Sequence, residues 1–157
     1  MDIFYYDIGN DINHHYINSV FEIILDDNAQ LNWSIIQNQN INNRQISSFN
    51  VGLQNNSICK FNSYDLGGGF IRREVHSYLH GEGGEFHMNS LLFPIKNQHF
   101  DIFSKIYHEV SNTNSRQLVK SILDDKAKGV YRGIANILKD ASKSNAIQSN
   151  KNLLLSS

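Results

Sequence analysis

Short apolar runs recur at a nearly constant interval along this chain, and polar or glycine-containing turns separate them. A turn followed by a new run occurs at Asn28, Asn55 and Gly83, which gives an interval of roughly 27–28 residues. Such an interval is typical of stacked repeat folds, in which each coil packs only on its neighbours. The next comparable turn, near Lys126, comes later than one interval, so we interpret residues 97–116 as an additional coil with a longer excursion.

The runs themselves are typical of β-strands, because they are rich in β-branched and aromatic residues and are bounded by turn residues. They occupy residues 3–6, 16–25, 31–37, 46–54, 58–64, 70–79, 85–93, 100–110, 117–123, 130–138 and 150–155. Helical periodicity is weak, so the chain is predicted to be all-β. The pattern alone is compatible with a sandwich or a barrel, but the regular interval favours a β-solenoid.

Length and composition define the broad class of protein. With 157 residues the chain can form one domain with a substantial core. Its single cysteine, Cys59, excludes an internal disulfide, as is typical of cytoplasmic proteins. No apolar run approaches the roughly 20 residues of a membrane span, and residues 1–10 lack the features of a signal peptide. We therefore expect a soluble cytoplasmic protein with no membrane partner.

Charge is unevenly distributed, although the formal net charge is only −1. Six acidic residues and no Lys or Arg precede Arg44, whereas residues 116–151 contain eight basic and three acidic residues. Such asymmetry can orient a partner, or it can be solvated surface that happens to segregate. The basic residues are spread singly over strands and turns without interleaved aromatics, so we expect no nucleic-acid partner.

Six segments from residue 68 onward carry a resemblance to a known family. They are GGFIRR at 68–73, GEFHMNSL at 84–91, PIKN at 94–97, NSRQL at 114–118, KGVYRG at 128–133 and NKNLLL at 150–155. In this order and spacing they resemble the core domain of the SufB/SufD family of iron–sulfur cluster assembly proteins, in particular its SufD branch. Residues 1–66 match that domain in the spacing of their apolar runs more than in the identity of their residues.

The resemblance implies a right-handed parallel β-helix that pairs with a related SufB-like subunit and with a SufC-like ATPase. In the family, such a complex receives sulfur and assembles an iron–sulfur cluster at the interface between its two β-helix subunits. The resemblance also implies that this chain is a scaffold subunit and not an enzyme. The cluster would then belong to the complex, and the chain alone would bind no cofactor.

The resemblance covers an internal part of a family member. In SufD-like proteins, coils with a Cys-x-His-Gly segment and helices that dock SufC follow the part that matches residues 150–155, and a helical region precedes the β-helix. We therefore expect residues 1–157 to be a partial core domain, incomplete at its C-terminal end, whose open strand edge promotes pairing or aggregation. A split-gene product and a non-functional fragment are alternatives to a working scaffold.

Cys59 is the first candidate for chemistry, because a thiolate can accept sulfur or bind iron. It lies in a predicted strand, residues 58–64, where a small buried side chain fits well. Free cysteines are among the most often buried residues. We therefore predict a structural role for Cys59.

The histidines are the second candidate set. On a strand, His76 and His80 lie on one face with Cα atoms about 13 Å apart, which is too far for one metal ion. Adjacent His14 and His15 point to opposite sides of a strand. The remaining histidines, His87, His99 and His108, are expected on solenoid faces. His87 could still face a neighbouring coil and bind a metal ion together with a distant partner. We predict no metal site among them.

Two carboxylate pairs suggest an alternative function. Asp124 with Asp125, and Glu82 with Glu85, would suit glycoside cleavage by a polysaccharide-acting β-solenoid. Both pairs lie in predicted turns, where turn chemistry explains them without catalysis.

Two further patterns have structural interpretations. Gly67-Gly68-Gly69 lacks the Lys-Ser or Lys-Thr of a phosphate loop and is predicted to be a turn between coils. Arg116-Gln117 is the most family-like polar pair, and its arginine, Arg116, is predicted to hydrogen-bond turn carbonyls or a neighbouring coil in a structural role. The sequence thus predicts no catalytic, cofactor-binding or metal-binding residue.

Overall fold

A computed structural model of the chain describes residues 1–9 and 14–156, and its regular structure consists of strands alone. They are β1 (Asp2–Gly9), β2 (Tyr16–Leu25), β3 (Gln30–Gln39), β4 (Arg44–Leu53), β5 (Ile58–Asp65), β6 (Phe70–Leu79), β7 (Glu85–Leu92), β8 (His99–His108), β9 (Asn114–Leu123), β10 (Lys128–Ile137) and β11 (Asn145–Leu154). No described residue is helical, so the described part has no helix that could cross a membrane. The all-β prediction is confirmed.

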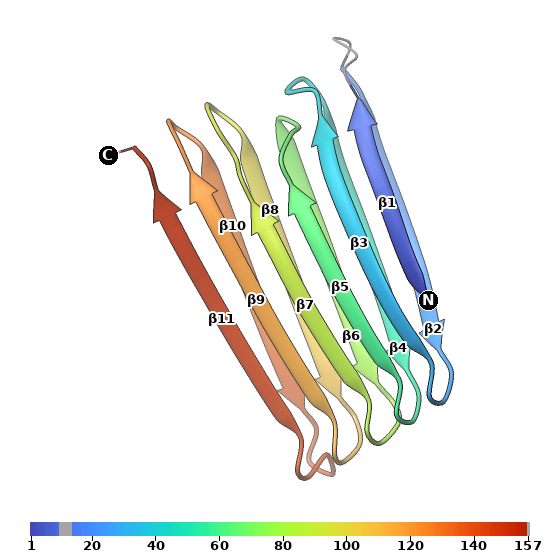
Figure 1. The fold of residues 1–157 in the computed structure, drawn as a ribbon. Coiled ribbons are helices and arrows are strands. Elements are labelled where there is room, and N and C mark those ends of the chain that lie inside the picture. The colour runs from blue at the N-terminus through green and yellow to red at the C-terminus, as the bar shows by residue number, and fades with distance from the viewer. Residues whose placement is uncertain (10–13, 157) are drawn as a thin grey trace.

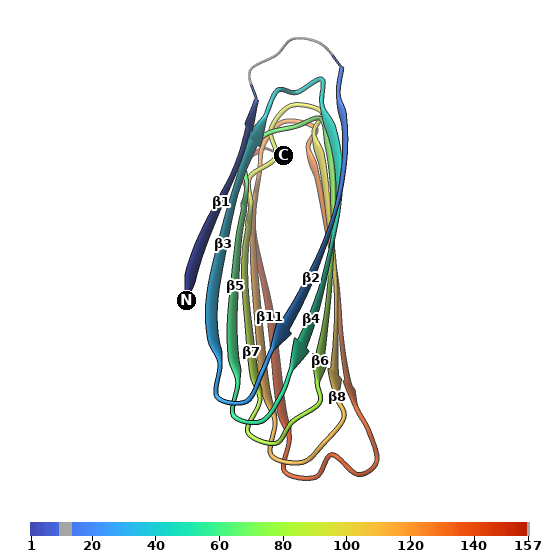
Figure 2. The ribbon, with the colours of Figure 1, turned by 90° about the vertical axis from the view of Figure 1, so that its right-hand side faces the viewer.

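The strands form two parallel sheets that face each other. Sheet A has the order β1-β3-β5-β7-β9-β11, and sheet B has the order β10-β8-β6-β4-β2. Because odd and even strands alternate between the sheets, the chain winds through about five coils, each with one strand per sheet. Figure 1 shows the strands stacked from blue to red along this winding, and Figure 2 shows the sheets as two walls joined by turns at both ends. The predicted parallel β-solenoid is confirmed.

Neighbouring strands in each sheet are one coil apart, and the interval between paired residues lies between 26 and 31 residues. Arg44 pairs with Phe70, 26 residues on, and Asn114 pairs with Asn145, 31 residues on. The region 97–116 follows the same rule, because β8 lies in parallel register with β6. The longer excursion predicted there is wrong. The chain has a series of turns at each end of the coils, and the turn near Lys126 belongs to the series opposite Gly83.

The turns are tight, and most of those described contain one residue with positive φ. At one end of the coils these residues are Asn28, Asn56, Gly83, Asn112 and Lys143, and at the other they are Gly68, Lys96 and Asp125. Asn, Asp and Gly tolerate this backbone conformation better than other residues do. The polar, asparagine-rich turns of the sequence therefore set the length of each coil.

Strand alternation sends every second side chain into the space between the sheets. β6 shows this most clearly, because buried and half-buried residues alternate along its whole length. Aromatic rings fill the first coils: Phe21 and Phe49 stack with centroids 4.5 Å apart, and Phe49 meets Phe61 edge-on at 4.9 Å. Such burial of apolar side chains is the main stabilising term of the fold.

Candidate functional site

A buried ion pair lies between the sheets. Arg73 on β6 and Asp65 on β5 are 1% and 0% exposed, and Arg73 Nη2 lies 2.5 Å from Asp65 Oδ1. Arg73 Nη1 also donates to Ser47 Oγ at 3.2 Å, and its Cζ lies 5.7 Å from the ring centre of Phe49. Sequence reasoning missed this pair. The signal was the alternation of β6, which places Arg73 on the same side as the apolar Ile71 and Val75.

Cys59 also lies in the interior, as predicted. Its side chain points into the core from β5 and is fully buried. Burial raises the pKa of the Cys59 thiol to about 12, because the surroundings disfavour the charged thiolate. Burial and the raised pKa favour the structural role predicted for Cys59.

His108 is buried as well, which corrects its predicted place on an outer face. Its Nδ1 lies 2.8 Å from Thr113 Oγ1 and its Nε2 lies 2.8 Å from Ser115 Oγ. Burial lowers the pKa of His108, because the interior disfavours the imidazolium form. The imidazole therefore bridges the end of β8 to the start of β9 in its neutral form.

The outer face of sheet B, over β6 and β8, carries His76 and His80 on one side, as predicted. His80 Nδ1 lies 2.7 Å from Glu109 Oε2, and the His76 ring meets Phe103 edge-on. Neighbouring charges on this face are paired too, since Arg72 contacts both Glu74 and Asp101. This hydrogen bonding raises the pKa of the Arg72 guanidinium, with Glu74 as the first cause.

Aromatic rings complete this outer face of sheet B. Tyr78 and Tyr107 stack with centroids 4.8 Å apart. The Lys105 ammonium lies over the Tyr107 ring, and the Arg132 guanidinium lies over the Phe103 ring at 4.5 Å. Most charges of this face thus have a partner on the face itself.

The other histidines are dispersed. His87 Nε2 lies 3.0 Å from Glu85 Oε2 on the outer face of sheet A, and the His99 ring lies 5.6 Å from Phe70 on sheet B. His14 contacts the carbonyl oxygen of Asn42, and the backbone of His15 donates to Asn43. Across residues 1–9 and 14–156, no three His, Cys, Asp or Glu residues gather in a way that could hold a metal ion.

The carboxylate pairs lie where turn chemistry explains them. Asp124 Oδ1 accepts the backbone N–H of Asp125 at 2.9 Å, and Asp125 has φ 57°. Glu82 is part of the turn before β7, and Glu85 is the first residue of β7, paired with His87. Asp125 lines a surface hollow with Lys96 and Lys126, and Asp124 is not among the lining residues of that hollow.

The glycine run is a close-packed turn, as predicted. A Cβ at Gly67 would lie 2.4 Å from the carbonyl oxygen of Gln39, and Gly68 has φ 84°. Arg116 and Gln117 point to opposite sides of β9: Arg116 is exposed, whereas Gln117 is buried and accepts a hydrogen bond from Tyr131 at 3.2 Å. The hydrogen bonds predicted for Arg116 are therefore not confirmed, and it is Gln117 that bonds within the interior.

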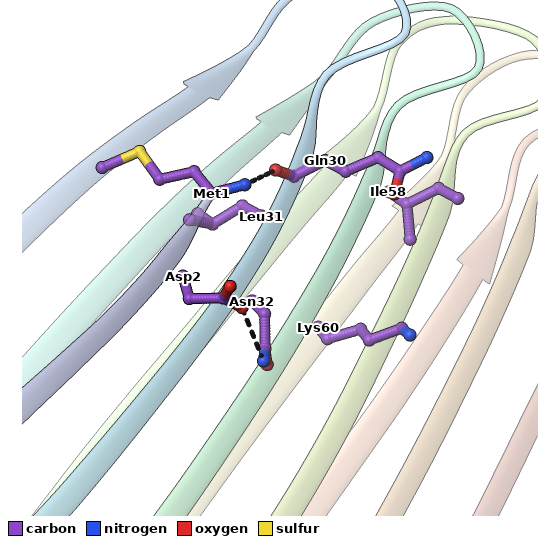
Figure 3. Close-up of a pocket in the computed structure, with 7 residues that line it drawn as sticks. All are labelled: Met1, Asp2, Gln30, Leu31, Asn32, Ile58 and Lys60. Carbon is purple, nitrogen blue, oxygen red and sulfur yellow. Dashed lines mark hydrogen bonds between the residues drawn. The ribbon is translucent and has the colours of Figure 1, made fainter.

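A shallow hollow of about 260 Å³ opens beside the first strands of sheet A (Figure 3). The Met1 amino group donates to the carbonyl oxygen of Gln30 at 2.9 Å, and Asn32 Nδ2 donates to Asp2 Oδ1 at 3.1 Å. Among the described residues that line this hollow, Lys60 alone has a cationic side chain. Met1 with Gln30 and Asp2 with Asn32 thus satisfy each other, and the residues that line the hollow form no constellation for catalysis.

Comparison with known proteins identifies the family. The family model for the SUF system FeS cluster assembly SufBD core domain matches residues 3–157. The chain belongs to the SufBD family. It is 30% identical to the iron–sulfur cluster assembly protein SufD of Escherichia coli over 141 residues, which cover 90% of the chain and 33% of SufD. It is also 30% identical over 118 residues to an iron–sulfur cluster assembly SufBD family protein of Staphylococcus saprophyticus, covering 75% of the chain and 25% of that relative.

The family match also extends over the first coils of this SufBD core, where the sequence resembled the family in the spacing of its apolar runs more than in residue identity. The chain spans about a third of E. coli SufD and a quarter of the S. saprophyticus relative. With its Cys59 and His108 enclosed, this SufBD core has its accessible polar groups on its outer faces and turns.

Proposed function

We propose that this chain is a scaffold part of an iron–sulfur cluster assembly complex, in which it supports a SufB-like subunit and a SufC-like ATPase. The observation that carries the proposal is the match of the SufBD core model to residues 3–157. The relatives that match are described as iron–sulfur cluster assembly proteins. The iron–sulfur cluster is the cargo of the proposed complex.

The geometry supports a structural contribution to that complex. The interior is filled by apolar side chains and by paired polar groups such as Asp65 with Arg73. Cys59 is enclosed, and burial raises its thiol pKa to about 12, so this conformation offers no thiolate for sulfur transfer. The chain would therefore act through its rigid shape and its outer surfaces.

A polysaccharide-acting enzyme has no comparable support. Glycoside hydrolysis needs two carboxyl groups facing each other across a substrate, at about 5–10 Å. Asp124 and Asp125 are adjacent turn residues, and Asp124 is engaged with the backbone of Asp125. Fold alone does not indicate an activity.

Co-purification tests the proposal. The chain is co-expressed with the SufB-like and SufC-like proteins of its own organism, with the affinity tag on the SufB-like protein. We expect the chain to be retained and the purified complex to build a cluster, seen by its visible absorption, after iron and sulfur are supplied. A β-solenoid of another family with similar size serves as the control. The proposal fails if the chain is not retained even when the downstream part of a SufD protein is supplied as a second chain.

A further inference from the structure

The outer face of sheet A over β5, β7, β9 and β11 carries an excess of unpaired positive charge. Its outward positions include one carboxylate, Glu85, and that group is engaged by His87 at 3.0 Å. Its four cations are exposed and form no ion pair with any described residue; they are Lys60, Arg116, Lys120 and Lys151. Sheet A therefore differs from sheet B, whose outer charges over β6 and β8 are largely paired.

Two adjoining hollows lie on this face of sheet A. One, of about 330 Å³, is lined by Asn62, Ser63, Tyr64, Asn89, Ser90, Leu91, Leu118 and Lys120. The other, of about 250 Å³, shares Leu91 and Lys120 with it and continues past Ile122 to Lys151 and Leu153. Among the described residues, no carboxylate lines either hollow. Together they form an open groove that is lined by apolar and uncharged polar residues and by the cations Lys120 and Lys151.

The strand register orders these side chains in one row across the sheet. Tyr64 pairs with Leu91, which pairs with Lys120, which pairs with Lys151. With strands about 4.8 Å apart, the row is about 14 Å long. This is the length of about nine or ten helical residues at 1.5 Å each, so a short helix lying across the strands would cover it.

We propose that this groove docks an acidic amphipathic helix of a partner protein. The apolar side chains of such a helix would cover Tyr64, Leu91 and Leu118, and its carboxylates would meet Lys120 and Lys151. The row carries apolar side chains at Tyr64 and Leu91 and cations at Lys120 and Lys151, which complements the two faces of such a helix. Tyr64 is the only aromatic side chain lining the groove, so it lacks the stacking platform of a single-stranded nucleic-acid site.

The test uses a fluorescein-labelled synthetic helix with leucines on one face and glutamates on the other. A second peptide carries lysines in place of the glutamates. In fluorescence anisotropy at low salt, we expect the acidic peptide to bind at least ~10-fold more tightly than the basic one. Lys120→Glu should weaken its binding ~10-fold or more, because the change reverses the charge shared by both hollows.

Lys105→Glu is the matched control, since it makes the same change on the outer face of sheet B and should leave binding unaltered. Thermal unfolding of both variants verifies that they fold. Equal binding of the two peptides, or equal effects of both variants, would overturn the proposal. So would tighter binding of a single-stranded oligonucleotide, or self-association that Lys120→Glu abolishes in sedimentation. The measurement needs no Suf partner, so its result does not depend on the proposed scaffold role.

Discussion

Arg72 and Arg73 are neighbours on β6, yet one faces solvent and the other faces the interior. Arg72 is 31% exposed and divides its hydrogen bonds between Glu74 and Asp101. Arg73 is 1% exposed and meets Asp65, which is fully enclosed. The two ion pairs have nearly the same length, since Arg72–Asp101 and Arg73–Asp65 are both 2.5 Å. What differs is the medium around each pair.

That difference determines how strongly the fold depends on each pair. Exposed pairs contribute about 0–1 kcal/mol, because water and salt screen them. A buried charge that loses its partner is far more costly, because water cannot reach it to replace the partner. We therefore expect the interior of the solenoid to tolerate little change and its outer face to tolerate much.

The largest effect is expected for Asp65→Asn. The substitution keeps the shape of the side chain but removes the charge opposite Arg73, so the free energy of unfolding should fall by about 3–5 kcal/mol. Urea unfolding followed by circular dichroism measures the loss.

A double variant separates the unpaired charge from a packing defect. Asp65→Leu combined with Arg73→Met removes both charges and keeps apolar volume, and such replacements are often neutral or stabilising. We expect it to recover most of the stability that Asp65→Asn loses. If the double variant is as unstable as the single one, packing rather than charge explains the loss.

The alternation of inward and outward positions along each strand could have revealed the Asp65–Arg73 pair in advance. The same alternation explains what the sequence did and did not predict. Strand positions follow from runs such as residues 70–79, which match β6. Turn residues such as Asn28 and Gly83 gave the coil interval. The two series of turns were harder to separate, because Asp124-Asp125 resembles the turns of the opposite end.

Side-chain partners were much less predictable. The partner of Arg73 lies eight residues away in the chain, at the end of β5, and the two residues meet across the turn between β5 and β6. The prediction of an outer face for His108 is wrong, because His108 lies two residues after the buried Ile106 and therefore on the same, inner side of β8. Thr113 and Ser115 supply the hydrogen bonds that make its burial tolerable, and that depends on the local turn.

Thiol labelling offers a second contrast between inside and outside. Cys59 is enclosed and its thiol pKa is about 12, so it should react with a thiol reagent at pH 8 only when the solenoid opens. The matched control is Lys60→Cys in a Cys59→Ser background, since Lys60 is the exposed neighbour on β5. We expect the control to react more than about 100-fold faster.

Similar rates for the two thiols would contradict the enclosed interior. Asp65→Asn should raise the rate at Cys59 and leave the rate of the Lys60→Cys control unchanged, because only the first depends on opening of the solenoid.

His108 makes the interior sensitive to pH. Its folded-state pKa is lowered by burial, so the unfolded chain, with a pKa near 6.5, binds the proton more readily. Stability should therefore be complete above about pH 6.5 and should fall as pH decreases toward the folded-state pKa. Each unit of lowering corresponds to about 1.4 kcal/mol.

Unfolding free energies of the parent and of His108→Gln, measured between pH 8 and pH 5, test this expectation. The variant should lose that part of the pH dependence, whereas His76→Gln on the outer face should retain it. If His108→Gln and the parent show the same pH dependence, another group is responsible.

The smallest effect is expected on the outer face itself. Asp101→Asn removes one partner of Arg72, but Glu74 still accepts from the guanidinium and solvent reaches both groups. The free energy of unfolding should fall by at most about 1 kcal/mol, and the loss should shrink further at high salt, where exposed charges are screened. Urea unfolding at low and high salt measures both effects. A loss as large as that of Asp65→Asn would show that the two arginines are equally important to the fold, and that exposure does not govern the strength of these pairs.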